Sequence, residues 1–153
     1  MFEGDNRSVD LRINVVPTLH GEDLAMRLLD RGTDLFSIDR LGMTPRQMDV
    51  YRPLLSQNGG MILFTGPTGS GKTVTLYASL SHLNDGRRKI HTIEDPIEYA
   101  IDGLRQSQVS PGIELGSHEL MRGVLRQAPD VVMIGEMRDE QIARTAAWAA
   151  NSG

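Results

Sequence analysis

One eight-residue segment constrains the fold of this 153-residue chain more than any other. Gly66–Thr73 reads Gly-Pro-Thr-Gly-Ser-Gly-Lys-Thr and matches the phosphate-loop pattern G-x-x-x-x-G-K-[ST] at every position. The apolar run Met61–Thr65 precedes it, and the amphipathic stretch Lys72–Leu83 opens at its last two residues. The sequence therefore predicts a buried strand, a loop and a helix in that order, which is the context that the pattern requires.

The residue types in this segment suit a bound phosphate. Glycines let the backbone turn its N–H groups inward at a helix N-terminus, where they surround phosphate oxygens. Lys72 adds a positive charge beside the outer phosphates, and the Thr73 hydroxyl is expected to bind Mg²⁺. A glycine-rich turn that only joins strand to helix would not require Lys-Thr at its end. We expect a nucleoside triphosphate to bind at Gly66, Pro67, Thr68, Gly69, Ser70, Gly71, Lys72, Thr73 and Val74.

Strand-like and helix-like segments alternate from Met61 onward. This alternation implies crossover connections and a mainly parallel sheet, so we expect an α/β fold. The expected strands are Met61–Thr65, Lys89–Glu94, Gln106–Val109 and Asp130–Gly135; the expected helices are Lys72–Leu83, Ser117–Gln127 (with Ser117 as its N-cap) and Asp139–Asn151.

The first 60 residues have a different pattern. Val9–Val16 alternates apolar and polar side chains, which is typical of a strand with one solvated face. Leu24–Leu29 is too short for its periodicity to separate a strand from a short helix. We interpret residues 31–43 as a charged linker or hinge and Thr44–Gln57 as a helix capped by Thr44.

Two of the expected strands end in carboxylates that suit ATP hydrolysis. Val131–Gly135 leads into Glu136, which we expect on the magnesium side of the site. Glu94 ends the strand Lys89–Glu94 and is a candidate general base, provided that this strand neighbours the phosphate-loop strand. The alternatives are a surface glutamate at a strand end and a solvated acidic turn before Pro96.

Composition excludes several other kinds of chemistry. The chain has no cysteine, so disulfides, thiolate zinc sites and cysteine nucleophiles are excluded. No apolar run approaches the roughly 20 residues of a membrane-spanning helix, and the first residues do not resemble a signal peptide. The net charge of −4 gives no attraction toward nucleic acid, and the four histidines show no metal-ligand spacing. We therefore expect a soluble, cytoplasmic chain.

Two arginines near the N-terminus lie in apolar surroundings. Arg12 lies inside Val9–Val16, and Arg27 lies among Ala25, Met26 and Leu28. Both are compatible with surface residues whose stems cover apolar neighbours. A guanidinium that a separate segment brings to the γ-phosphate would instead stabilise transition-state charge, and the pattern alone does not choose between the two roles.

Three segments together resemble the ATPases of type II secretion and type IV pilus assembly. They are G-P-T-G-S-G-K-T-V-T-L-Y at Gly66–Tyr77, T-I-E-D-P-I-E-Y at Thr92–Tyr99 and L-R-Q-A-P-D-V-V-M-I-G-E-M-R-D at Leu125–Asp139. Asp10–Asp30 resembles the end of the PAS-like N-terminal subdomain of the same family. The resemblance covers nearly the whole chain in order. The phosphate loop is common to many NTPases, whereas the other two segments are particular to this family.

The resemblance implies a RecA-like core that hydrolyses ATP with Mg²⁺. It implies Glu94 as catalytic base, Glu136 near magnesium, and Arg12 and Arg27 as groups that reach the γ-phosphate. Residues 1–30 would end the PAS-like subdomain, residues 31–43 would form the hinge, and residues 44–153 would form an incomplete core. The expected assembly is a homo-hexamer at the inner membrane face, bound to the cytoplasmic domains of platform proteins and not inserted in the membrane.

The chain departs from the family pattern in two respects. Ala128 replaces an aspartate that usually precedes Pro-Asp, which we expect to be tolerated. The sequence stops before the family's His-box, so we expect a fragment. Two alternative functions stay open: a RecA-like nucleic-acid motor, which the acidic charge and few aromatics disfavour, and a nucleotide-binding fragment without efficient turnover.

Overall fold

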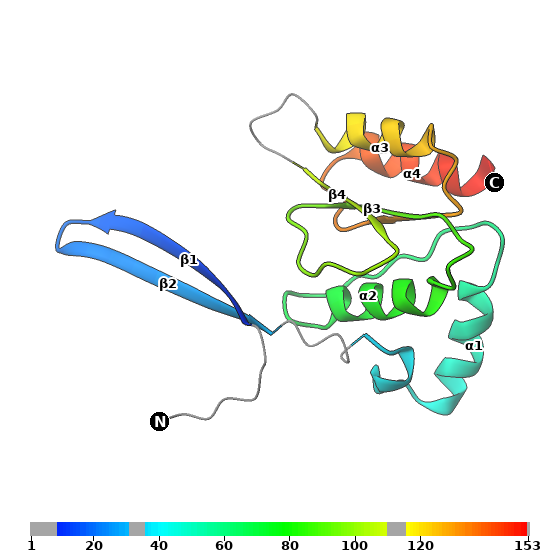
Figure 1. Cartoon of the computed structure of the whole chain (residues 1–153), viewed down its shortest axis with the longest axis horizontal. Coiled ribbons are helices and arrows are strands. Elements are labelled where there is room, and N and C mark those ends of the chain that lie inside the picture. The colour runs from blue at the N-terminus through cyan, green and yellow to red at the C-terminus, as the bar shows by residue number, and fades with distance from the viewer. Residues whose placement is uncertain (1–8, 31–35, 110–115, 153) are drawn as a thin grey trace. The chain divides into compact units, whose positions relative to one another are not determined.

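The computed structural model describes residues 9–30, 36–109 and 116–152. It divides the chain into two compact units, residues 1–35 and 36–153 (Figure 1). The linker expected at 31–43 spans this boundary, and its first five residues lie outside the described ones. None of the helices in the described ranges has the length and apolar character needed to cross a membrane.

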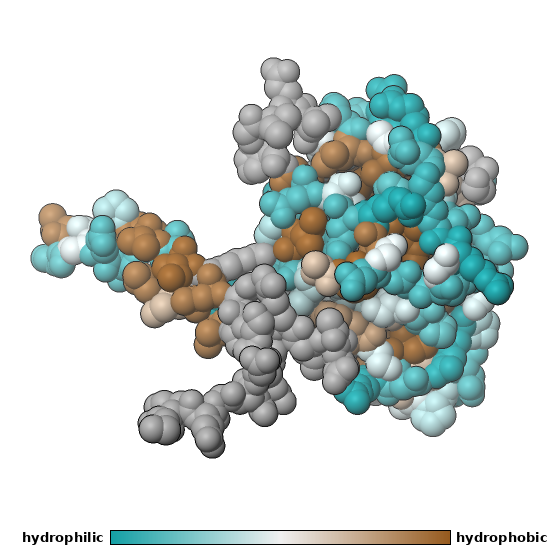
Figure 2. Space-filling view, viewed as in Figure 1, coloured by the Kyte–Doolittle hydropathy of each residue, from teal (hydrophilic) through white to brown (hydrophobic). Residues whose placement is uncertain are grey.

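The first unit contains an antiparallel hairpin of β1 (Val9–Thr18) and β2 (Gly21–Asp30). Leu24–Leu29 is therefore strand, because every residue of β2 pairs with β1. At every second position of the ladder, two apolar residues are paired: Leu11 with Leu28, Ile13 with Met26, and Val15 with Leu24. These six side chains are all exposed and form the brown surface of the hairpin in Figure 2.

The second unit contains a three-stranded parallel sheet in the order β4–β3–β5. Its strands are β3 (Ile90–Glu94), β4 (Arg105–Gln108) and β5 (Val131–Ile134). Its helices are α1 (Pro45–Leu55), α2 (Lys72–Leu83), α3 (Ser117–Leu125), α4 (Glu140–Ser152) and the short 3-10 helix η2 (Ile38–Arg40). The expected α/β class with a parallel sheet is confirmed.

Helices cover both faces of this sheet, as Figure 1 shows. On one face, Ile90 and Met133 pack with Leu80 and Leu83 of α2. On the other face, Ile93 packs with residues of α3 and α4. All five residues of β3 are buried, which is the pattern of a parallel strand that is covered on both sides. Because side chains alternate along a strand, Thr92 and Glu94 lie on the same face as Ile90, the face that α2 covers.

Residues 36–40 begin the second unit and pack against α2 and the segment that follows β3. Phe36 and Ile38 are buried, and the Phe36 ring lies 5.2 Å from that of Tyr77 and 4.8 Å from that of Tyr99. α1 then begins as the sequence predicts, because Thr44 and Gln47 form a reciprocal capping box and Pro45 occupies the first turn.

Two local predictions are wrong. Met61–Thr65 is not a strand, and Met61, Ile62 and Leu63 are exposed. An apolar run becomes a strand only beside a partner strand, and the described parallel sheet consists of β4, β3 and β5 alone, so this run pairs with none of them. Ser117 is the first residue of α3 instead of its N-cap; Gly116 holds the cap position, without a side-chain hydrogen bond.

His91 is a buried titratable residue in the middle of β3. Neither ring nitrogen has a hydrogen-bond partner in the described structure. Burial lowers the pKa of His91 from its ordinary value of 6.5, and the positive charges of Arg105 and Lys89 lower it further. Since the unfolded chain binds this proton more tightly than the folded chain, the free energy of unfolding falls as pH drops below 6.5.

Replacing His91 with leucine is therefore expected to stabilise the chain. The gain is about 1 kcal/mol at neutral pH, because two unpaired buried nitrogens are removed. The gain should grow as pH falls from 7.5 to 5.5, as measured by urea unfolding. The matched control is His82→Gln, at an exposed position on α2, which should keep the wild-type pH dependence. If the free energies of unfolding of His91→Leu and wild type had the same pH dependence, His91 would not be the cause of the loss of stability at low pH.

Candidate active site

The phosphate-loop segment is a sharp turn that ends at the start of α2. Gly69 and Gly71 adopt φ angles of +77° and +90°, in the left-handed region that disfavours residues with a Cβ. Gly71 is the N-cap of α2 and supplies no side-chain cap, so the first N–H groups of the helix are available to an anion. The local geometry thus fits the predicted phosphate site.

Lys72 is folded back over this loop. Its ammonium group donates to the carbonyl oxygens of Gly66 at 2.7 Å and Pro67 at 2.8 Å. Both acceptors belong to the loop itself, so the ammonium charge lies at the loop.

Glu94 lies at the carboxyl end of β3 and is 4% exposed. Its Oε1 accepts hydrogen bonds from Thr92 Oγ1 at 2.5 Å and Gln106 Nε2 at 3.1 Å, and its Oε2 accepts one from the Tyr77 hydroxyl. The donors come from β3, β4 and α2. A buried carboxylate is stable only when such donors replace water, and here three of them do so.

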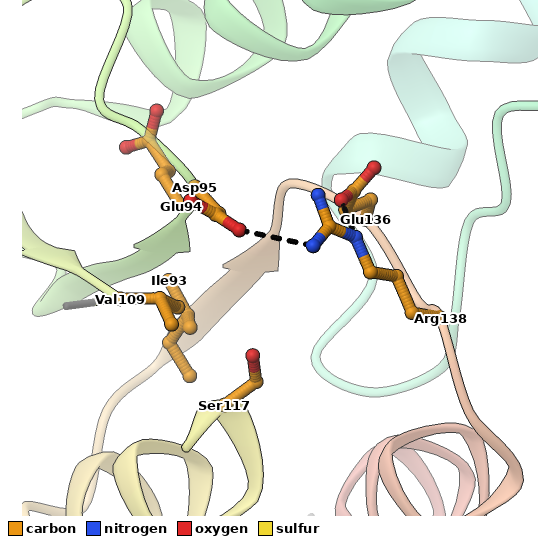
Figure 3. Close-up of a pocket in the computed structure, with 7 residues that line it drawn as sticks. All are labelled: Ile93, Glu94, Asp95, Val109, Ser117, Glu136 and Arg138. Carbon is orange, nitrogen blue, oxygen red and sulfur yellow. Dashed lines mark ion pairs between the residues drawn. The ribbon is translucent and has the colours of Figure 1, made fainter. Parts of the chain in front are cut away.

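Glu136 lies just beyond the carboxyl end of β5, in an ion pair. Arg138 Nε contacts the Glu136 carboxylate, and Arg138 Nη1 lies 3.2 Å from Asp95 Oδ2. Figure 3 shows Asp95 and Glu136 on either side of the Arg138 guanidinium. One arginine thus joins the residues that follow two neighbouring parallel strands.

The structure brings some of the predicted site residues together. A small pocket at the carboxyl ends of β3 and β5 is lined by Ile93, Glu94, Asp95, Val109, Ser117, Glu136 and Arg138. Both predicted glutamates belong to it, whereas the phosphate-loop residues do not. The condition that makes Glu94 a candidate base, a phosphate-loop strand beside its own strand, is not met, because Met61–Thr65 forms no strand and β4 and β5 flank β3. Contact between Glu94 and the phosphate-loop helix runs instead through Tyr77 of α2.

Arg12 and Arg27 lie on the hairpin of the first unit. Their Cα positions are direct partners in the register of β1 and β2. Arg27 is exposed, and the side chain of Arg12 lies outside the described part of the structure.

The expected magnesium ligands are Thr73 and Glu136. Thr73 is exposed in the first turn of α2. No group of three or more His, Cys, Asp or Glu residues suitable for a metal occurs within the described ranges. A hydroxyl and a carboxylate are nevertheless a hard-oxygen set that fits Mg²⁺, which binds through one or two protein groups together with nucleotide phosphates.

Sequence reasoning missed the residues that hold the two glutamates. They are Tyr77, Thr92 and Gln106 around Glu94, and Arg138 between Asp95 and Glu136. The Thr92–Glu94 contact follows from their i, i+2 spacing on one strand face. The Tyr77 and Gln106 contacts depend on how α2 and β4 pack, for which the sequence contains no local signal.

The matching family model and two similar curated proteins all belong to type II or type IV secretion systems. The family described as "Type II/IV secretion system protein" matches residues 2–153. The chain is 48% identical over 153 residues to "Type II secretion system protein E" of Xanthomonas campestris pv. campestris, covering 100% of this chain and 27% of that protein. It is 48% identical over 147 residues to "Type II secretion system ATPase E" of Vibrio cholerae, covering 96% of this chain and 29% of that protein.

A solved structure also resembles the chain. The pilus retraction motor PilT with bound ADP superposes with a TM-score of 0.78 at 31% identity, covering 96% of this chain and 44% of that one. The ATPase DotB of Legionella pneumophila, at 23% identity and a TM-score of 0.74, has the same fold. The chain thus spans less than a third of the length of the two secretion proteins and under half of PilT.

Proposed function

Because the chain belongs to the type II/IV secretion system protein family, we propose that it is the nucleotide-binding part of an ATPase motor for type II secretion or type IV pilus assembly. The observation that carries this proposal is the open N-terminus of α2, preceded by the complete phosphate-loop segment with Lys72 held at the loop. The relatives named as secretion proteins and the similarity to PilT support it.

The proposed reaction is hydrolysis of ATP to ADP and phosphate with Mg²⁺. Gly66–Val74 surround the phosphates, Lys72 neutralises their charge, and Thr73 and Glu136 would hold Mg²⁺, which would supply positive charge beside the phosphates. Glu94 accepts a proton from the attacking water. Arg12 and Arg27 reach the γ-phosphate from the hairpin, whose unit moves relative to the core about a hinge near residues 31–43.

The proposed assembly is a homo-hexamer in which residues 44–153 belong to a RecA-like core and residues 1–30 to a PAS-like subdomain. It works in the cytoplasm at the inner membrane face, through the cytoplasmic domains of platform proteins. The relatives named above favour secretion or assembly over retraction, since the sequence identity to the two type II secretion proteins is 48% and that to the retraction motor is 31%.

Stimulation of phosphate release tests this proposal against a nucleic-acid motor. The full-length gene product is assayed with ATP and Mg²⁺, alone, with single- and double-stranded DNA, and with the cytoplasmic domain of the platform protein from the same gene cluster. We expect stimulation by the platform domain and none by DNA. Stimulation by DNA alone would replace the proposed function with that of a nucleic-acid motor.

A further inference from the structure

The carboxylate of Glu94, the proposed general base, accepts three side-chain hydrogen bonds. An ionised carboxylate has about four acceptor positions on its two oxygens. Thr92, Gln106 and Tyr77 occupy three of them in this structure. One position is left, which is the number that a base needs in order to accept a proton from a single water molecule. The donors therefore fix the direction in which Glu94 can act.

Tyr77 differs from the other two donors in its place in the fold. Thr92 lies on the same strand as Glu94, and Gln106 lies on the neighbouring strand β4, so both belong to the sheet. Tyr77 lies on α2, five residues after Lys72, and is 1% exposed. Of the three side-chain hydrogen bonds that Glu94 accepts within the described residues, the bond from Tyr77 is the one that joins it to the helix at the end of the phosphate loop.

The Tyr77 hydroxyl is itself held in place. Its ring packs against Phe36 at 5.2 Å and Tyr99 at 5.6 Å between centroids, and the backbone N–H of Tyr99 donates to its oxygen at 3.3 Å. Burial and the hydrogen bond to Glu94 raise the pKa of Tyr77 above its ordinary value of 10. The hydroxyl therefore keeps its proton at physiological pH and is a donor to Glu94.

We propose that Tyr77 is a positioning residue for ATP hydrolysis. Its hydroxyl fixes the orientation of the Glu94 carboxylate and ties that carboxylate to the phosphate-loop helix. This inference rests on the proposed function, because it assigns to Tyr77 the task of aligning the proposed base with the loop that binds its substrate. It does not place Tyr77 in contact with the nucleotide.

Tyr77→Phe tests the inference with little disturbance of the fold. Phenylalanine keeps the ring contacts with Phe36 and Tyr99 and removes only the hydroxyl. Loss of one charge-assisted hydrogen bond should lower kcat of the full-length gene product about tenfold. KM for ATP should stay unchanged, because the phosphate loop is intact. Turnover is measured as steady-state phosphate release with Mg²⁺.

Tyr51→Phe is the matched control. The Tyr51 hydroxyl is also buried and also contacts α2, since it lies 2.5 Å from Ser79 Oγ, but it does not contact Glu94. Both variants lose one buried hydroxyl and should have a lower melting temperature, with the larger decrease for Tyr77→Phe because its bond is to a carboxylate. Only Tyr77→Phe should lower kcat. Equal kcat values for the two variants would overturn the inference, whatever their stabilities.

A double-mutant cycle with Glu94→Gln separates positioning from a general structural role. If Tyr77 acts through Glu94, Tyr77→Phe should have no further effect on single-turnover hydrolysis in the Glu94→Gln background. An undiminished tenfold effect in that background, or a raised KM in place of a lowered kcat, would overturn the inference. The proposed function fails separately: wild-type protein without ATP hydrolysis contradicts that function, whereas active wild type with unaffected Tyr77→Phe contradicts only the role of Tyr77.

Discussion

Replacing Glu94 with glutamine is expected to lower ATP turnover by the full-length gene product by about 10²- to 10⁴-fold, the usual contribution of a general base. Glutamine has the same shape, and its amide oxygen can still accept from Thr92 and Gln106. The Tyr77 hydroxyl can accept from the new amide N–H group, but its own proton loses the carboxylate oxygen to which it donates, so a modest loss of stability is expected as well. What is lost is the negative charge that receives a proton.

Nucleotide binding distinguishes this loss from misfolding. Glu94 does not belong to the phosphate loop, so the affinity of the Glu94→Gln variant for ATP should match that of wild type when measured by calorimetry. Glu140→Gln is the matched control: it makes the same chemical change at an exposed position on α4, where Glu140 pairs with Arg144, and should leave turnover unchanged. Wild-type turnover in Glu94→Gln would remove Glu94 as the base.

Replacing Lys72 with alanine should weaken ATP binding about 10- to 100-fold, the equivalent of one charge-assisted hydrogen bond of roughly 1.5–3 kcal/mol. Within the described residues, the Lys72 ammonium contacts the carbonyl oxygens of Gly66 and Pro67 in its own loop and pairs with no buried carboxylate, so its removal leaves no such charge without a partner. The fold should therefore survive. Calorimetric titration with ATP and Mg²⁺ measures the loss.

The second lysine of the chain provides the control for this experiment. Lys89 lies just before β3, outside the phosphate loop. Its Nζ donates to the carbonyl oxygen of Gln127. Lys89→Ala removes the same charge from the chain, so it should leave the affinity for ATP unchanged even where it lowers stability. Equal losses of affinity in the two variants would show that net charge, and not the position of Lys72, governs binding.

Local patterns were sufficient to predict much of this fold. The limits of α2 match the sequence prediction because Gly71 and the Asn-Asp-Gly turn after Leu83 give strong start and stop signals. The start of α1 follows from a capping box that spans only four residues. The parallel sheet follows from alternating strands and helices, since a parallel pair requires a crossover.

Features that depend on distant partners were not predictable in this way. Met61–Thr65 has the composition of a buried strand, but composition does not supply a neighbouring strand. Leu24–Leu29 is a strand because it pairs with β1, which its own six residues do not reveal. The bond from Tyr77 to Glu94 joins residues 17 positions apart, on a helix and a strand, and exists only because α2 packs on that face of the sheet.

The most direct test of the central claim is steady-state phosphate release by the full-length gene product with ATP. The claim is that the phosphate loop and Glu94 serve one magnesium-dependent ATPase site. We predict turnover that requires Mg²⁺, stops on addition of EDTA, and is lost in both the Lys72→Ala and Glu94→Gln variants at low ATP concentration. Wild-type protein that binds ATP but releases no phosphate, even as a hexamer with its platform domain present, would contradict the account.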